Sequence, residues 1–145
     1  MPVNTYTTPS TYSQITEARW GRDLVLIDCE AGGVSATATG DWPTVAGRPN
    51  LHEAHRRRAI TSPGELLHRP EYGAGLVLSV GHVANTQRLI QAANALRTNA
   101  ARDRRVADVR ASVTLDDTDR VIAELSIQPR GEPDSDTVSV VSRSA

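Results

Sequence analysis

The sequence predicts an α+β domain in which short helices and one long helix pack on a small antiparallel sheet. Apolar residues recur at helical spacing over residues 83–100, and they alternate with polar residues over 109–127. These patterns occupy successive blocks of a 145-residue chain, which is the length of one ordinary domain. Successive blocks, rather than repeated strand–helix units, favour the α+β class over a parallel α/β sheet.

The composition argues against several kinds of site. Apolar residues make up 39% of the chain, but only two Trp and three Tyr are aromatic, so Val, Leu, Ile and Ala must form the core. Sixteen basic residues, all of them Arg, nearly balance seventeen acidic ones. Near-neutral charge and few stacking side chains argue against a nucleic-acid binder. The single cysteine, Cys29, has no disulfide partner and no metal-ligand spacing, and we expect neither a metal nor a cofactor.

The chain divides into three stretches by composition. Residues 1–16 are rich in Thr, Ser and Pro and predict an extended N-terminal arm that only a partner would order. Residues 17–128 carry the periodic segments of the main domain, and 129–145 predict a loop followed by a strand or tail. No signal-peptide pattern or membrane-length apolar run is visible, so we expect a soluble protein made in the cytoplasm.

The first half of the main domain predicts a strand, a loop and a short helix. Residues 23–28 (DLVLID) have strand character, and the Gly- and Thr-rich residues 29–49 predict a loop or loose hairpin. Residues 50–60 predict the helix, in which Asn50 and Glu53 have the spacing of a capping box. The predicted inner face of this helix consists of Leu51, Ala54 and the stem of Arg58.

The second half predicts a long helix followed by a hairpin. The inner face of the helix at 83–100 is predicted to hold Val83, Thr86, Leu89, Ile90, Ala93 and Leu96. Residues 109–115 and 121–127 alternate in polarity around the polar turn 116–119, as in an antiparallel hairpin with one buried face. Residues 137–142 predict either a third strand or part of a free tail.

Residues 61–75 (TSPGELLHRPEYGAG) predict a rigid corner between the two helices. The sequence at 62–64 suits a β-turn with Pro in the second position and Gly in the third. Gly73 and Gly75 permit a positive φ or a close approach of two backbone segments. Tyr72 can bury its ring while its hydroxyl stays in water. Every one of these features serves shape rather than catalysis.

The histidines suggest a zinc site, but their spacing does not support one. His52 and His55 are three residues apart, whereas the zinc-protease motif places two histidines four apart. A third ligand would have to come from His68 or His82, at no recognised spacing. We therefore expect solvent-facing histidines on an amphipathic helix.

Other charged residues also have structural interpretations. Glu65 and Glu71 would act as a glycosidase pair only at a defined separation, which the sequence does not fix, and we expect no enzymatic activity. The arginine clusters at 56–58 and 102–105 are by default solvated helix surfaces. The second cluster lies between the long helix and the first hairpin strand, where two rigid elements would position it.

Two motifs lie in a distinctive order within residues 50–128. The first, aliphatic-Thr-x-x-Gly followed by Pro-Glu-aromatic-Gly, consists of Ile60, Thr61, Gly64, Pro70, Glu71, Tyr72 and Gly73. The second consists of Asp103, Arg104, Arg105 and Val106. In this arrangement of helices and hairpin, the motifs resemble the small baseplate wedge subunit family of contractile phage tails, type VI secretion systems and extracellular contractile injection systems. Some members of that family carry a lysozyme-like label, and the family usually has Pro where Arg104 stands.

The resemblance implies a structural protein of the inner baseplate of a virion or injection particle, with one copy per wedge and six per baseplate. It implies that Asp103, Arg104 and Arg105 contact the helical core bundle of the larger wedge proteins. It also implies that 17–128 form the wedge domain, whose sheet accepts a strand from the sheath protein and templates sheath assembly. Tube and hub proteins are further candidate partners.

Two other interpretations remain open from the sequence. A regulatory binding module of the same fold class, such as a bacterial anti-adaptor, would share the architecture. Such a regulator would not need the triad at 103–105, which favours the baseplate interpretation. A hydrolase using His52, His55 or Glu65 is the third alternative.

Overall fold

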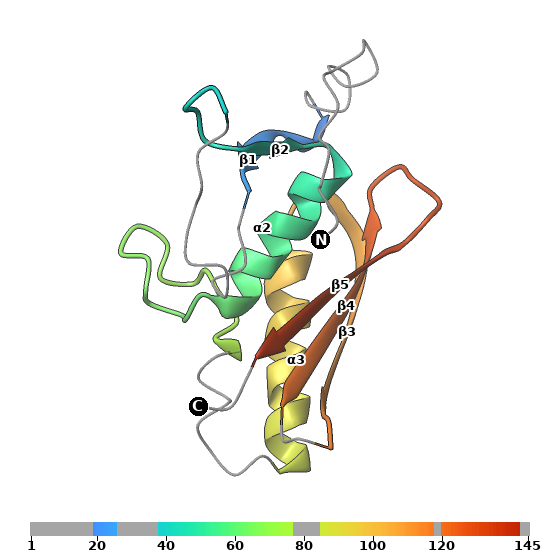
Figure 1. The fold of residues 1–145 in the computed structure, drawn as a ribbon. Helices are drawn as coiled ribbons and strands as arrows, with labels where there is room; N and C mark the ends of the chain where they lie inside the picture. Colours follow the sequence, from blue (N-terminus) through green and yellow to red (C-terminus); the bar gives the residue numbers. More distant parts are fainter. Residues whose placement is uncertain (1–18, 26–37, 77–84, 118–119, 143–145) are drawn as a thin grey trace. The chain divides into compact units, whose positions relative to one another are not determined.

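The structure is a computed structural model that describes residues 19–25, 38–76, 85–117 and 120–142 (Figure 1). These residues form two helices, a two-stranded sheet and a three-stranded sheet, both antiparallel, which confirms the α+β class. The chain consists of two compact units, Met1–Glu53 and Ala54–Ala145, each described below by itself. Among the described residues, no helix has the length and apolar character needed to cross a membrane.

The first unit contains the two-stranded sheet. Strand β1 (Arg22–Leu24) pairs antiparallel with β2 (Thr44–Ala46). The strand predicted at 23–28 is thus found at its start, and the stretch 29–49, predicted as a loop or loose hairpin, contains the partner strand. The predicted N-terminal arm, Cys29 and the end of the predicted strand lie outside the described residues.

Helix α2 (Arg48–Ile60) begins in the first unit and ends in the second. It starts before the predicted position, so Asn50 lies inside the first turn and the predicted capping box with Glu53 is wrong. The buried side chain of Asn50 instead donates a hydrogen bond from Nδ2 to the carbonyl oxygen of Trp20, at 3.0 Å. This bond holds the start of α2 to the residue that precedes β1.

The buried face of α2 consists of Leu51, His55 and Ala59, which recur every fourth residue. The predicted inner face was right only at Leu51, since Ala54 and Arg58 are only half-buried. The expectation that His55 faces solvent is wrong, because the residue is 1% exposed. The prediction relied on the polarity of the histidine side chain. The four-residue spacing of His55 with Leu51 and Ala59 instead indicates that it lies on the buried face.

The second unit is a helix packed on a three-stranded sheet (Figure 1). Strand β3 (Val106–Leu115) pairs antiparallel with β4 (Val121–Pro129), and β4 pairs antiparallel with β5 (Asp136–Ser142). The predicted hairpin is confirmed, and residues 137–142 belong to a third strand rather than a tail. Because the strand order is β3-β4-β5, the first and last strands form the edges of this sheet.

Helix α3 (Thr86–Ala101) confirms the predicted long helix and packs mainly on β3. Asn85 caps its N-terminus by accepting a hydrogen bond from the backbone N–H of Arg88, at 2.9 Å. The predicted inner face was only partly right: Leu96 is buried, but Ile90 is 56% exposed. The buried residues of this helix are Ala92, Leu96 and Ala100.

The sheet contributes alternate side chains to the core, as the two-residue period predicts. The buried apolar residues of its strands are Val106, Val109, Val113, Val121, Ala123, Leu125, Ile127, Pro129, Val138 and Val140. The register shifts between Val106 and Asp108, where β3 has a bulge. The bulge explains why Val106 and Val109 are both buried although they are an odd number of residues apart.

Candidate partner-binding site

The predicted triad lies in the tight connection between α3 and β3. Asp103 is 8% exposed, and its Oδ1 accepts hydrogen bonds from the backbone N–H and from Nε of Arg105, each at 3.0 Å. Its Oδ2 accepts a third hydrogen bond from Nη2 of Arg105, at 2.7 Å. Two parallel N–H···O bonds between a guanidinium and a carboxylate fix both groups. Asp103 therefore sets the orientation of Arg105, whose side chain is 23% exposed.

The charge of Asp103 is stabilised despite its burial. Burial by itself raises the pKa of this carboxyl, but the hydrogen bonds from the side chain and backbone of Arg105 and the charges of Arg105 and His55 outweigh it. The net result is a pKa lowered from 3.8 to about 2. Nε2 of His55 lies 3.8 Å from Oδ2 of Asp103, so helix α2 places a buried ring against the triad.

The backbone of the triad is held by Arg130, which follows β4. The backbone N–H of Arg130 donates to the carbonyl oxygen of Arg105 at 2.8 Å, and its Nε donates to the carbonyl oxygen of Arg104 at 3.2 Å. Its Nη2 donates to the carbonyl oxygen of Val106, also at 3.2 Å. These bonds restrain the backbone where the resembling family usually has a proline. The side chain of Arg104 is exposed.

The first turn of the corner has the predicted form. The backbone N–H of Glu65 donates to the carbonyl oxygen of Ser62 at 3.1 Å, and Gly64 has a φ of 84°. Pro63 and Gly64 are therefore the central residues of a type II turn. The N–H of Gly64 donates to the carbonyl oxygen of Pro70 at 2.8 Å, which closes the loop on itself.

The corner also closes onto the end of α2. Oγ1 of Thr61 donates to the carbonyl oxygen of Arg57 at 2.8 Å, and the carbonyl oxygen of Thr61 accepts from the N–H of Gly75 at 2.9 Å. Gly73 has a φ of 103°, and a Cβ there would lie 2.3 Å from the carbonyl oxygen of Thr61. Only glycine fits this approach of two backbone segments.

Two arginines join the corner to the end of α3. Nη1 of Arg58 donates to the carbonyl oxygen of Asn99 at 2.8 Å, and its guanidinium lies 4.7 Å from the ring centre of Tyr72. Nη1 of Arg102 donates to the carbonyl oxygen of Glu71 at 2.9 Å. The corner and the triad therefore belong to one bonded framework.

Sequence reasoning did not identify three residues of this framework: His55, Arg58 and Arg130. Arg58 was predicted to place its stem on the inner face of α2 and was also counted in a solvated arginine cluster, but its guanidinium is bonded to the end of α3. The buried-face spacing of α2 would have found His55, whereas no local pattern marks Arg130. Its role depends on the pairing of β3 with β4, which brings residue 130 back beside residues 104–106.

Of the candidate catalytic residues that the structure describes, His52 and His55 lie on α2, and Glu65, His68 and Glu71 lie on the corner. Within the described ranges, no group of three or more His, Cys, Asp or Glu side chains is arranged to hold a metal ion. His52 is half-buried on α2, His68 is exposed on the corner, and His82 lies outside the described residues. The carboxylate of Glu65 accepts a hydrogen bond from the N–H of Ser62 at 2.9 Å, so it supports the turn.

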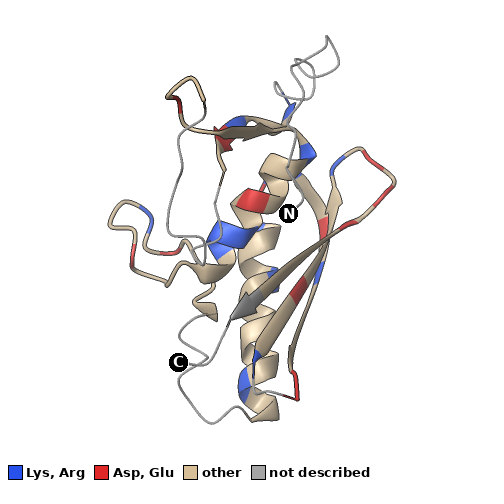
Figure 2. Ribbon diagram, viewed as in Figure 1, with Lys and Arg blue, Asp and Glu red and all other residues tan. Residues whose placement is uncertain are grey.

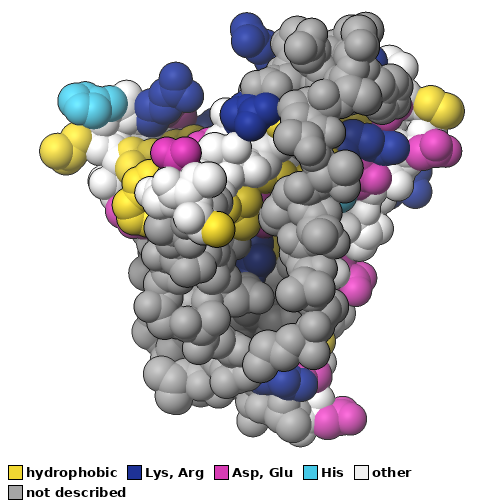
Figure 3. Space-filling view, turned by 45° about the horizontal axis from the view of Figure 1, so that its top comes forward, with side chains coloured by type: hydrophobic (Ala, Val, Ile, Leu, Met, Phe, Trp, Pro, Cys, Tyr) yellow, Lys and Arg dark blue, Asp and Glu magenta, His cyan; other side chains and the backbone are white. Residues whose placement is uncertain are grey.

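The corner also exposes apolar surface. Leu66 is 43% exposed and Leu67 is 89% exposed. Figure 3 shows hydrophobic side chains beside a histidine at the left of that view, the side on which the corner lies in Figure 1.

Comparison with known proteins identifies shared folds. No protein-family model and no curated protein sequence matches the chain. A chain of the anti-feeding prophage baseplate is similar with a TM-score of 0.59 and 19% identity, over 83% of this chain and 94% of that chain. A putative tail lysozyme from Geobacter sulfurreducens is similar with a TM-score of 0.51 and 21% identity, over 68% of this chain and 94% of that chain. The protein therefore has a fold like that of a chain of the anti-feeding prophage baseplate.

Proposed function

We propose that this protein is a non-enzymatic structural subunit of the baseplate of a contractile tail or injection particle. More specifically, it is the small wedge subunit that links the larger wedge proteins to the first sheath ring. The observation that carries the proposal is the likeness to a chain of the anti-feeding prophage baseplate, which extends over 94% of that chain. The order of the corner and triad motifs supports the same assignment. The protein would be made in the bacterial cytoplasm and reside in the baseplate, in six copies.

The triad is the proposed docking site for the larger wedge proteins. Asp103 orients Arg105 before any partner arrives, and Arg104 presents an exposed guanidinium beside it. A guanidinium fork suits carboxylates and the carbonyl oxygens at helix ends. Because the orientation of Arg105 is already fixed, docking loses less side-chain entropy than it would with a mobile arginine. This arrangement favours a permanent structural contact.

The sheet edges are the proposed contact with the sheath protein. Strand β4 lies between β3 and β5, so β3 and β5 each have one side that no described strand pairs with. An edge strand accepts a further strand through main-chain hydrogen bonds. A sheath strand added at β5 or β3 would give the first sheath ring its position and so template assembly.

A lysozyme-like activity has little support from the candidate acids. This activity is considered because the similar Geobacter sulfurreducens protein is described as a putative tail lysozyme. Glycosidases need two carboxyl groups roughly 5–10 Å apart across a substrate cleft. The carboxylate of Glu65 supports a turn and Glu71 is exposed on the corner. The regulatory module remains the second candidate, because fold alone does not separate it from a baseplate subunit.

The proposal is tested by removing the gene from the source strain and imaging its particles by electron microscopy. We expect particles without assembled baseplates and sheaths, and restoration by the wild-type gene supplied in trans. Complete, contractile particles in the deletion strain would contradict the proposal. A bacterial cell-wall digestion assay on the purified protein tests the hydrolase alternative, for which we expect no release of soluble fragments.

A further inference from the structure

A pocket of about 390 Å³ lies between the end of α3 and the start of β3, apart from the side chains of the triad. Its lining residues are Arg97, Thr98, Ala101, Val106, Ala107, Asp108, Val109 and Arg130. All of them belong to the second unit, and they come from a helix, a strand and the turn after β4. The pocket therefore has rigid walls on several sides.

The charges around the pocket favour an anionic group. Arg97 and Arg130 face it from two different elements, and Asp108 is its one acidic lining residue. The carboxylate of Asp108 lies 4.0 Å from Nε of Arg110, so a neighbouring cation offsets its charge. Helix α3 contains no acidic residue between Thr86 and Ala101, as Figure 2 also shows. Within the described part of the chain, the side chain of Arg97 has neither a hydrogen bond nor an ion pair.

The walls between the two arginines are aliphatic. Val106 and Val109 are buried in the sheet, and Ala101 and Ala107 are exposed beside them. A carboxylate on a short aliphatic stem matches this combination better than a bare inorganic anion does. Strand β3 pairs with β4 on one side and with no described strand on the other, so that side can accept the backbone of an extended peptide.

We propose that this pocket binds an acidic segment of a partner protein, with a Glu or Asp side chain held between Arg97 and Arg130. In the partner segment, the aliphatic residues that flank this Glu or Asp would pack against Ala101 and Ala107. The backbone bonds of Arg130 to residues 104–106 join this pocket to the triad, so both surfaces belong to one interface. The pocket goes beyond the proposed docking through the triad side chains, and either assignment can fail without the other.

The test uses nuclear magnetic resonance on the full chain labelled with ¹⁵N. The probes are the capped tripeptides Val-Glu-Val and Val-Gln-Val, with sodium acetate and inorganic phosphate as free anions. We expect Val-Glu-Val to shift the amide signals of Thr98, Ala101, Ala107 and Val109 with saturation at millimolar concentration. The neutral tripeptide should bind roughly tenfold more weakly, because a charge-assisted hydrogen bond is lost.

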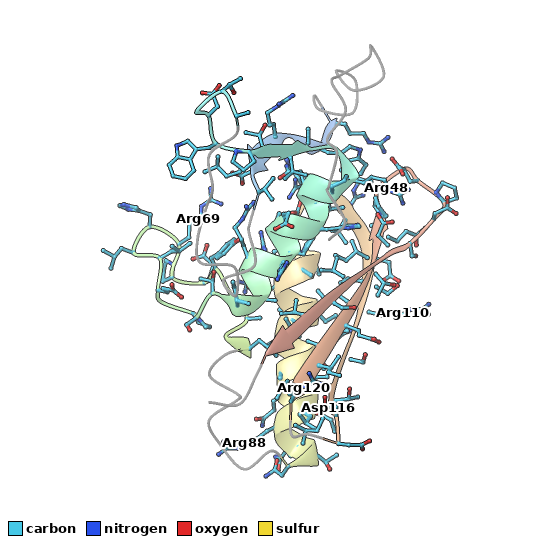
Figure 4. The ribbon with its side chains drawn as sticks, in the orientation of Figure 1. Arg48, Arg69, Arg88, Arg110, Asp116 and Arg120 are labelled. Carbon is cyan, nitrogen blue, oxygen red and sulfur yellow. The ribbon has the colours of Figure 1, made fainter. Side chains whose placement is uncertain are left out.

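Matched variants locate the site. Arg97→Gln changes an exposed helix residue and should weaken binding of Val-Glu-Val roughly tenfold, as should Arg130→Gln. Arg88→Gln, at the opposite end of α3 in Figure 4, should leave binding unchanged. No shift at the four amides, equal binding of the two tripeptides, or an unchanged affinity in Arg97→Gln would overturn the proposal. Acetate or phosphate binding as tightly as Val-Glu-Val would also overturn it, in favour of a simple anion site.

Discussion

The carboxylate of Asp103 holds the guanidinium of Arg105, with Oδ2 of Asp103 2.7 Å from Nη2 of Arg105. The same carboxylate accepts the backbone N–H of Arg105 and lies against the buried ring of His55. The triad is thus both a proposed docking surface and a set of contacts that connects α2, α3 and β3. The two roles predict different effects for different substitutions.

The structural role predicts that Asp103→Asn destabilises the protein. The substitution removes the negative charge that Arg105 and His55 face, while the shape of the side chain is nearly kept. We expect the free energy of unfolding to fall by about 2 kcal/mol, because charge-assisted hydrogen bonds are worth about 1.5–3 kcal/mol each. Urea denaturation of the wild type and the variant measures this difference in the free energy of unfolding. An unchanged midpoint would mean that the ion pair adds nothing to stability.

The lowered pKa of Asp103 predicts a loss of stability in acid. Its pKa falls from 3.8 to about 2 on folding, so the unfolded state takes up the proton first as the pH drops. The stabilisation is complete above about pH 4, declines as the pH falls and is lost below about pH 2. The full contribution corresponds to about 2 kcal/mol. Urea midpoints measured between pH 6 and 2 should show this decline in the wild type.

Asp103→Asn is the control for the acid titration. Because it has no carboxyl group at position 103, its stability should fall less than that of the wild type between pH 4 and 2. Parallel curves for the two proteins would contradict the assignment of the lowered pKa to Asp103.

The docking role is tested by Arg104→Glu, because this side chain is exposed and the hydrogen bond from Arg130 is accepted by its backbone carbonyl oxygen. Charge reversal there should leave the unfolding midpoint nearly unchanged but prevent recovery of the protein in assembled particles. Arg88→Glu is the matched control, since Arg88 is exposed at the start of α3, at the opposite end of that helix from the triad (Figure 4). Equal incorporation of both variants would refute docking through Arg104.

The corner predicts unequal effects of alanine at two glycines. Gly73→Ala would place Cβ 2.3 Å from the carbonyl oxygen of Thr61 and should cost about 3 kcal/mol or more. Gly64→Ala has a similar positive φ but open space around Cβ, and should cost only about 1–2 kcal/mol. Thermal unfolding compares the two. Equal losses would mean that φ strain alone, rather than the contact with Thr61, explains the requirement for glycine.

Local patterns predicted most elements of the fold, although β2 was left within a loop or loose hairpin and β5 as either a strand or a tail. The two-residue period of β3 and β4 identified the hairpin, and the turn residues at 62–64 identified a β-turn, which the positive φ of Gly64 shows to be type II. The faces of the helices were harder, since the sequence of α3 allows an apolar stripe through Ile90 as well as the buried one through Leu96. Packing on β3 decides between the two stripes, and that contact is not encoded locally.

The site was predicted less completely than the fold. The adjacent residues of the triad can be read from the sequence, but their ties to His55 and Arg130 depend on tertiary structure. The turn between β3 and β4 is a contrasting case: Asp116 and Arg120 lie four residues apart and pair at 2.7 Å (Figure 4). Contacts across a few residues are accessible from sequence, whereas contacts between elements require the fold.

The measurement that tests the central claim most directly is gentle affinity purification of the tagged protein from its source strain, followed by mass spectrometry. The account predicts one large particle that contains sheath, tube and larger wedge proteins. Recovery of a single small partner, or of the protein alone, would contradict a baseplate role and favour the regulatory module.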